Sequence, residues 1–379
     1  MKNMKKWVGT FSISPINLML TNLQFKNETI WIKLKVSIGG SLLRIKFSNL
    51  FGSLPLNIEE VYIYKIGEQS SKNYQKILFN GEEGISISEN KEIFSDIMDF
   101  EIEPSEDIWI GIYIKEFTEL STGNFSDSMH YFTEKNNLLK NFYALDKKDK
   151  INEYQNSIVP FITNIDILTS SDHKALVAFG DSITAINNWT VYLTEKLQQN
   201  KIGNISVLRQ GINGNRLIYD SIPIIKGLYG CSGLSRFERD AILQAGTAFI
   251  IIFLGINDLI HPLGNAPKNE KVTAKELIDG FKICIERARE KNIKTIGATL
   301  MPFHGYKLYS KELECIRNEV NQWIRSSTDY DSIIDFDEIM RDQNNPQKLK
   351  AEYDSGDGLH PNDAGAKAMA DSIDLKNFS

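Results

Sequence analysis

The sequence predicts a two-domain protein in which an N-terminal β-sandwich (jelly-roll-like, residues 1–171) precedes a three-layer α/β/α domain (residues 172–379) with a five-stranded parallel sheet. Three observations predict this architecture. The chain has 379 residues, more than one ordinary domain needs. Apolar and polar residues alternate up to about residue 170, whereas short continuous apolar runs alternate with helical segments from residue 174 onward.

The alternation in the first half is clearest in residues 30–48, IWIKLKVSIGGSLLRIKFS. Apolar residues occupy every second position on each side of Gly39 and Gly40, which predicts a hairpin with one buried face and one wet face. Residues 107–115, DIWIGIYIK, repeat the pattern. Several such strands without long helical stretches predict a β-sandwich.

The second half contains apolar runs that are too short for helices and lack alternation. They are ALVAF (175–179), ISVL (205–208), AFIIIFL (248–254), TIGATL (295–300) and SIIDF (332–336). Amphipathic helices are predicted between them, most clearly at residues 273–292 and 310–327. Strands buried on both faces that alternate with helices predict a parallel sheet covered on both sides.

Composition excludes several classes of function. A formal net charge of -6, mixed in sign along the chain, argues against nucleic acid as a partner. No apolar run is long enough to span a bilayer, and polar residues interrupt the apolar stretch after the basic N-terminus. We therefore expect a cytoplasmic protein without a membrane partner. Cys284 and Cys315 occupy apolar helical positions and are expected to be reduced core residues.

No histidine, cysteine or carboxylate cluster has metal-ligand spacing, and no glycine-rich segment has the layout of a dinucleotide or phosphate loop. The sequence therefore predicts no metal and no cofactor, and it makes no prediction of oligomeric state.

Polar residues follow each predicted strand of the second half, where ligands bind in parallel sheets. Ser182 follows the first strand, the turn INGN (212–215) the second, GIND (255–258) the third and His304 the fourth. DGLH (357–360) comes some twenty residues after the fifth. We therefore expect these groups to converge at one edge of the sheet.

Three of these residues supply the parts of an acyl-transfer site. Ser182 offers a hydroxyl nucleophile, His360 a base, and Asp357 a carboxylate that would orient the imidazole. The alternative is that GDS is only a turn at the end of a strand. The presence of the base and carboxylate favours the chemical interpretation.

A tetrahedral intermediate also needs hydrogen-bond donors for its oxyanion. The backbone amides of Ser182 and Gly214 and the side-chain amide of Asn257 are the candidates. Asn257 could instead only hold a turn, and Gly211 in the same turn is an alternative to Gly214.

Other polar residues near the strand ends are expected to be structural. Asp181 is expected to pin the turn by accepting amide hydrogens, and Arg216 to lie on the surface. His261 and His304 are expected to be satisfied by local hydrogen bonds, with a place in the pocket as the alternative.

Four segments, GDSIT (180–184), INGN, GIND and DGLH, resemble the ordered motifs of the SGNH hydrolases, also called GDSL-type esterases and lipases. The resemblance implies Ser182 as nucleophile, Gly214 and Asn257 as oxyanion donors, His360 as base and Asp357 as its partner. Relatives commonly continue GDSIT with Asp-Gly, whereas Ala185 and Ile186 stand here.

WVGTFSISP (7–15) and residues 36–56 resemble a bacterial subgroup with a β-rich domain before the hydrolase domain. That subgroup is labelled lipase or acylhydrolase, and related enzymes remove acetyl groups from sugars. The resemblance implies a serine esterase that hydrolyses small acyl esters by a Ser-His-Asp acyl-enzyme mechanism. Its expected substrate is a small-molecule or carbohydrate ester, with O-acetyl groups on carbohydrate as the first expectation. The alternatives are a lipase or thioesterase for longer acyl chains and a glycan-binding protein with a non-catalytic second domain.

Overall fold

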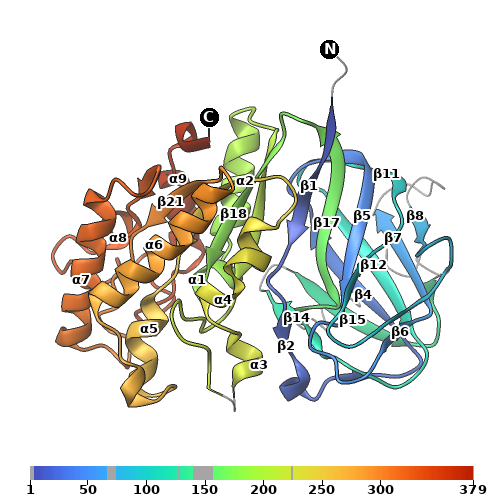
Figure 1. The fold of residues 1–379 in the computed structure, drawn as a ribbon, viewed down its shortest axis with the longest axis horizontal. Helices are drawn as coiled ribbons and strands as arrows, with labels where there is room; N and C mark the ends of the chain where they lie inside the picture. The colour runs from blue at the N-terminus through green and yellow to red at the C-terminus, as the bar shows by residue number, and fades with distance from the viewer. Residues whose placement is uncertain (1–3, 66–73, 127–128, 140–156, 223–224, 379) are drawn as a thin grey trace. The chain divides into compact units, whose positions relative to one another are not determined.

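The computed structural model describes residues 4–65, 74–126, 129–139, 157–222 and 225–378. The chain divides into two compact units, Met1–His173 and Lys174–Ser379 (Figure 1). The boundary suggested by the sequence, after residue 171, lies close to this division.

The first unit is built from antiparallel strands in two five-stranded sheets. One sheet contains β1 (Lys5–Ser12), β17 (Ile162–Ser170), β5 (Gly40–Ser48), β10 (Glu92–Phe94) and β11 (Met98–Ile102). The other contains β15 (His130–Lys135), β4 (Glu28–Lys35), β12 (Asp107–Ile114), β7 (Glu60–Lys65) and β8 (Tyr74–Ile77). Shorter strands form small sheets: β16 (Ile158–Pro160), β14 (Thr122–Phe125) and β2 (Ile16–Asn17); β13 (Thr118–Glu119) and β3 (Gln24–Phe25); β6 (Leu56–Ile58) and β9 (Ile85–Ile87).

The predicted hairpin around Gly39 and Gly40 is wrong, because β4 and β5 belong to different sheets. β4 pairs with β12 and β15, whereas β5 pairs with β17, β10 and β11. In the connection, the N–H of Ser37 donates to the carbonyl of Thr10 at 2.8 Å, and that of Val36 to Glu106 at 3.0 Å. Alternation identifies a half-buried strand in either sheet, so it could not identify the partner.

The second unit contains one parallel sheet in the order β19-β18-β20-β21-β22. The five predicted apolar runs are its five strands: β18 (Lys174–Gly180), β19 (Ile205–Gly211), β20 (Thr247–Phe253), β21 (Lys294–Ala298) and β22 (Ser332–Ile334). The prediction of a five-stranded parallel sheet is therefore confirmed. Because all strands run the same way, their carboxyl ends meet at one edge.

Helices connect these strands, and the two clearest predicted helices are present as α6 (Ala274–Glu290) and α7 (Lys311–Ser326). Each begins after a residue that caps it: the side chain of Thr273 accepts from the N–H of Glu276, and that of Ser310 from the N–H of Leu313. The others are α1 (Ser182–Ala185), α2 (Trp189–Gln199), α3 (Lys226–Tyr229), α4 (Gly233–Phe237), α5 (Ile256–Ile260), α8 (Phe336–Met340) and α9 (Asp363–Ser372), with a π-helical turn at Glu238–Ile242.

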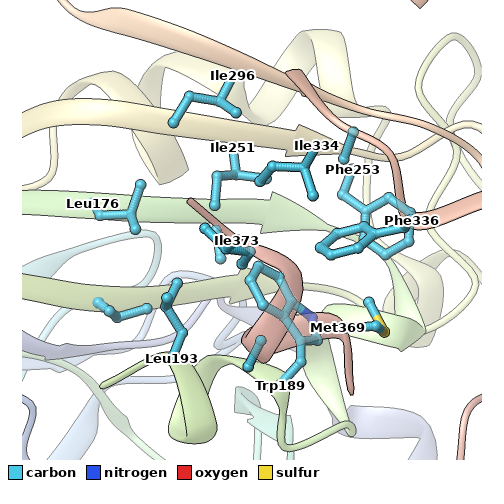
Figure 2. Packing of buried hydrophobic residues seen from close by; sticks show 14 of the residues in the cluster. Leu176, Trp189, Leu193, Ile251, Phe253, Ile296, Ile334, Phe336, Met369 and Ile373 are labelled. Carbon is cyan, nitrogen blue, oxygen red and sulfur yellow. The ribbon is translucent and has the colours of Figure 1, made fainter. Parts of the chain in front are cut away.

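One face of the sheet packs against α2, α8 and α9 in a continuous hydrophobic core (Figure 2). Leu176, Ile251 and Ile296 project from neighbouring strands into this cluster, and Trp189 of α2 contacts Phe336 of α8 with ring centroids 5.8 Å apart. This packing fixes the sheet from which the polar loops extend.

The cysteines follow the prediction only in part. All three are free, and Cys284 is buried on α6, as predicted. Cys315 is exposed on α7, so its assignment to the core is wrong. The two helices share the same amphipathic pattern, and Cys315 lies just outside the buried stripe that contains Leu313, Val320 and Ile324.

Candidate active site

The nucleophile candidate lies where β18 turns into α1. Ser182 is the first residue of α1 and is 8% exposed. The carboxylate of Asp181 accepts the N–H of Ile183 at 3.0 Å, which confirms its expected role in pinning the turn. Gly180 is required because a Cβ there would lie 2.3 Å from Oγ1 of Thr184. The hydroxyl of Ser182 is therefore held at a turn too tight for a larger residue at position 180.

A chain of two hydrogen bonds joins Ser182, His360 and Asp357. Oγ of Ser182 lies 2.9 Å from Nε2 of His360, and Nδ1 of His360 lies 2.7 Å from Oδ2 of Asp357. Burial favours the neutral acid of Asp357, but the hydrogen bonds from the ring and N–H of His360 and the N–H of Leu359 outweigh it and lower the pKa. An ionised carboxylate only accepts, so Nδ1 carries the proton and Nε2 accepts from the serine.

The loop that carries His360 is fixed from several sides. The carboxylate of Asp354 accepts the N–H of Gly358 at 3.1 Å, and the side chain of Asn187 donates to the carbonyl of Pro361 at 3.0 Å. Gly358 has φ +75°, and a Cβ there would lie 2.6 Å from the backbone N of Tyr306. The loop after β21 therefore packs directly against the loop that carries His360.

The turn after β19 brings Gly214 to the same edge. Gly214 has φ +67°, a conformation that favours glycine, and no backbone carbonyl in the described part of the chain accepts its N–H. Gly211 has a different role, because a Cβ there would lie 2.3 Å from the N of Ala185. It lets β19 approach the nucleophile turn, whereas Gly214 presents a backbone donor.

Asn257 and Asp258 on α5 both hold this turn. Asn257 is 4% exposed, and its Nδ2 donates to the carbonyl of Asn215 at 3.0 Å, which leaves a second N–H for a ligand. The carboxylate of Asp258 accepts the N–H groups of Leu217 at 2.7 Å and Ile218 at 2.9 Å. The turn-holding role weighed for Asn257 is thus present and compatible with a second donor function.

Two buried carboxyl groups accompany the site without taking the place of the base. Burial is the largest effect on both and raises the pKa of Asp181 to about 7 and of Asp258 to about 6. In the described part of the chain, the side chain of Asp181 accepts one backbone N–H and that of Asp258 accepts two, and neither makes a hydrogen bond to Ser182. The imidazole of His360 remains the group in contact with the hydroxyl.

Arg216 and the two other histidines differ in their environments. Arg216 is 2% exposed and lies 2.7 Å from the carboxylate of Glu270, so the expected surface position is wrong. The ring of His261 lies 5.4 Å from that of Tyr229, and burial, followed by the charge of Arg216, lowers its pKa to about 4. The ring of His304 packs against Tyr309 at 4.7 Å.

Residues that the sequence analysis did not single out surround the site. The ring of Tyr229 covers Gly214, because a Cβ on that glycine would lie 2.7 Å from its Cγ. Burial and the charges of Asp357 and Tyr229 raise the pKa of Tyr306. The guanidinium of Arg236 is buried behind the turn. None of these residues belongs to a strand-end motif, so a single sequence carried no signal for them.

The described residues include no group of three or more His, Cys, Asp or Glu side chains arranged to hold a metal ion. No described helix has both the length and the apolar character that crossing a membrane requires.

Comparison with known proteins supplies the family. A model of the GDSL-like lipase/acylhydrolase family matches residues 176–373, just over half of the chain. No curated protein matches. Similar solved structures include a GDSL-like lipase from Bacteroides thetaiotaomicron (18% identity, 54% of this chain and 88% of that chain, TM-score 0.40). They also include an acetyl xylan esterase from Geobacillus stearothermophilus (20% identity, 55% and 97%, TM-score 0.41). By the family match, the chain belongs to the GDSL-like lipase/acylhydrolases and is a carboxylic ester hydrolase.

Proposed function

We propose that the protein is a serine esterase that hydrolyses small acyl esters through an acyl-enzyme, with O-acetyl groups on carbohydrate as its substrates. The observation that carries the proposal is the pair of hydrogen bonds that connects Ser182 Oγ to His360 Nε2 at 2.9 Å and His360 Nδ1 to Asp357 Oδ2 at 2.7 Å. Nucleophile, base and orienting carboxylate are thereby already aligned.

In the first half of the reaction, Ser182 Oγ attacks the ester carbonyl while its proton passes to His360 Nε2. The carbon–oxygen bond to the alcohol then breaks, and the imidazolium gives that proton to the departing alcohol. In the second half, His360 deprotonates a water that attacks the acyl-enzyme, and the carboxylic acid leaves as Ser182 is reprotonated.

The oxyanion formed at each tetrahedral stage needs donors that are already in place. The N–H of Ser182 lies at the first position of α1 and therefore has no partner within that helix. Gly214 and Asn257 supply the other two donors, and Asn257 is held at the carbonyl of Asn215. One such donor is worth roughly 3 kcal/mol of the barrier.

Two tyrosines support the choice of substrate. The ring of Tyr229 fills the space beside Gly214, which favours a short acyl group over a long chain at that position. Tyr229 and Tyr306 are both half-buried, the first at the turn of Gly214 and the second beside Gly358. Aromatic faces with hydroxyl groups fit the apolar faces and hydroxyls of a sugar ring.

The test compares the wild-type protein with Ser182→Ala. The wild type should release p-nitrophenol from p-nitrophenyl acetate and acetate from an acetylated sugar, and the variant should do neither at an unchanged melting temperature. Residual hydrolysis at the wild-type rate in the variant contradicts the mechanism. A rate optimum at octanoate or longer esters contradicts the choice of acyl group.

A further inference from the structure

Arg236 lies entirely inside the second unit, where burial of its charge costs free energy. The residue is 1% exposed, and its guanidinium lies over the ring of Phe179 at 4.1 Å. It pairs with the buried carboxylate of Asp240 at 3.2 Å. A buried ion pair contributes little net stability compared with apolar residues of similar size, so the pair by itself does not account for the arginine.

Other N–H groups of Arg236 donate to oxygen atoms of residues that lie close in the chain to the proposed oxyanion donors. One donates to the carbonyl of Gly180 at 2.7 Å, two residues before Ser182. Another donates to Oδ1 of Asn215 at 2.9 Å, directly after Gly214. A third reaches the carbonyl of Gln210 at 3.0 Å, near the end of β19.

Asn215 connects Arg236 to Asn257, the third proposed oxyanion donor. Its backbone carbonyl accepts from Nδ2 of Asn257 at 3.0 Å. Its own Nδ2 donates to the carbonyls of Tyr229 at 2.8 Å and Cys231 at 2.7 Å, which fixes the side chain that Arg236 binds. Gly180, Asn215 and Asn257 come from three different strand ends, and Arg236 with Asn215 connects them all.

We propose that Arg236 is a positioning residue that sets the spacing of the oxyanion donors Ser182 N–H, Gly214 N–H and Asn257 Nδ2. The inference rests on the proposed esterase function and adds to it a residue outside the strand-end motifs. The planar guanidinium presents five N–H donors in fixed directions, so one side chain can hold two strand ends and a turn at once. A lysine offers a single charged centre on a flexible stem and cannot reproduce that geometry.

This role predicts a selective effect on turnover. The oxyanion exists only in the tetrahedral states, so a misplaced donor weakens binding of the transition state and leaves binding of the ester largely unchanged. A displacement of about 1 Å in a reacting geometry can cost on the order of 10²-fold in rate. The effect should therefore appear in kcat rather than in KM.

The experiment compares Arg236→Lys and Arg236→Met with the wild type on p-nitrophenyl acetate. We expect Arg236→Lys to lower kcat by about 10- to 100-fold while KM changes by less than about threefold. Active-site titration with a fluorophosphonate reports the concentration of competent Ser182, so that kcat refers to folded enzyme. The acid limb of the pH profile should stay in place. The hydrogen bonds described for Arg236 go to strand-end carbonyls, Asn215 and Asp240, and not to the His360–Asp357 pair.

Arg317→Met is the matched control. Arg317 is also 1% exposed and binds Glu314 at 2.7 Å, Asp337 at 2.6 Å and the carbonyl of Leu300 at 2.8 Å. We expect this variant to lower the melting temperature without a selective loss of kcat. Equal kcat effects for the Arg236 and Arg317 variants overturn the inference, because burial of any arginine would then explain them.

Three further variants, Asn215→Ala, Asn257→Ala and the double variant Arg236→Lys/Asn257→Ala, separate positioning from folding. Asn215→Ala removes the Oδ1 atom that accepts from Arg236. It should give the same selective loss of kcat, and it tests the inference even if the Arg236 variants do not fold. In the double variant Arg236→Lys/Asn257→Ala, the loss of kcat should be well below the product of the single losses, because both changes disable one oxyanion site. Multiplicative losses, or an Asn215→Ala variant with wild-type kcat, overturn the inference.

The behaviour of the wild-type protein distinguishes a failure of the proposed esterase function from a failure of the positioning role of Arg236. If the wild type hydrolyses the ester and the variants match its kcat, only the positioning role is wrong. A wild-type protein that neither hydrolyses the ester nor reacts with the fluorophosphonate contradicts the esterase mechanism and the positioning role together.

Discussion

Nδ1 of His360 lies 2.7 Å from Oδ2 of Asp357, three residues earlier in the same loop. The other carboxylate oxygen accepts the N–H groups of Leu359 at 2.9 Å and His360 at 2.8 Å. The carboxylate is thus fixed by the same segment that carries the imidazole. The orientation of the ring is a local property of the loop, and the charge on Asp357 can be removed without removing the backbone hydrogen bonds.

Asp357→Asn should lower kcat by about 10³- to 10⁴-fold. The amide can still accept from Leu359 and His360, but its NH₂ group favours the tautomer that presents a proton on Nε2 to Ser182. Steady-state kinetics on p-nitrophenyl acetate measure the loss. Asp354→Asn is the control, because the hydrogen bonds described for the Asp354 carboxylate come from the N–H groups of Gly356 at 2.8 Å and Gly358 at 3.1 Å and not from the imidazole. A comparable loss in both variants would show that loop structure, not carboxylate charge, matters.

Gly214→Ala should destabilise the fold and lower kcat. The new Cβ would lie 2.7 Å from Cγ of Tyr229 at φ +67°, so either the ring of Tyr229 or the turn at Gly214 must move. Strain at this φ alone costs on the order of 1 kcal/mol, and displacement of the turn affects catalysis. Gly203→Ala is the control, since a Cβ there meets nothing within 4 Å, and it should leave both the unfolding free energy and kcat nearly unchanged. If Gly214→Ala behaves like Gly203→Ala, the turn is more adaptable than its packing indicates.

Tyr229→Ala should broaden the acyl preference toward longer chains. Removal of the ring opens the space beside Gly214 that it now fills, and each methylene newly buried there contributes about 0.8 kcal/mol to binding. The ratio of kcat/KM for butyrate to that for acetate should therefore rise several-fold, whereas Tyr229→Phe, which keeps the ring, should retain the wild-type ratio. An unchanged ratio in Tyr229→Ala places the acyl group elsewhere.

His261 should make the folded state less stable in acid. Burial, followed by the charge of Arg216, lowers the pKa of His261 from 6.5 to about 4. Above pH 6.5 the residue is neutral in both states. As the pH falls below 6.5, the unfolded chain takes up a proton that the folded chain does not, and the free energy of unfolding declines until the pH reaches about 4.

Comparison with His261→Gln isolates this contribution from the carboxyl groups that titrate in the same range. Between pH 7 and pH 4 the wild type should lose up to about 3 kcal/mol more unfolding free energy than the variant. Urea unfolding at several pH values provides the measurement, and parallel pH curves for the two proteins would contradict it.

The second unit was predictable because its signals are local. A strand buried on both faces appears as a continuous apolar run, and all five runs became strands of the sheet. The rule that parallel strands end at one edge placed Ser182 there, whereas His360 comes some twenty residues after the last strand and reaches the same edge through a longer loop. The site roles stay predictions until they are tested, but the atoms named from the sequence lie within hydrogen-bonding distance of each other.

The errors share a physical origin. Alternation in residues 30–48 describes how a strand is buried and contains nothing about its partner, so β4 and β5 were paired wrongly. The amphipathic pattern of α7 could not show that Cys315 lies beyond the edge of the buried stripe. Polarity suggested a surface position for Arg216, whereas the residue is buried and pairs with the partly exposed Glu270, far along the chain.

The positions of the strands along the chain and the chemical character of the segments that follow them were determined by the sequence alone, because burial periodicity and residue type act over a few neighbouring positions. Only the tertiary structure decided how those ends are held together. Arg236 joins Gly180 to Asn215, and Tyr229 covers Gly214, through contacts between segments that are distant in sequence. Such contacts depend on the directions of side chains in space, and no local pattern records them.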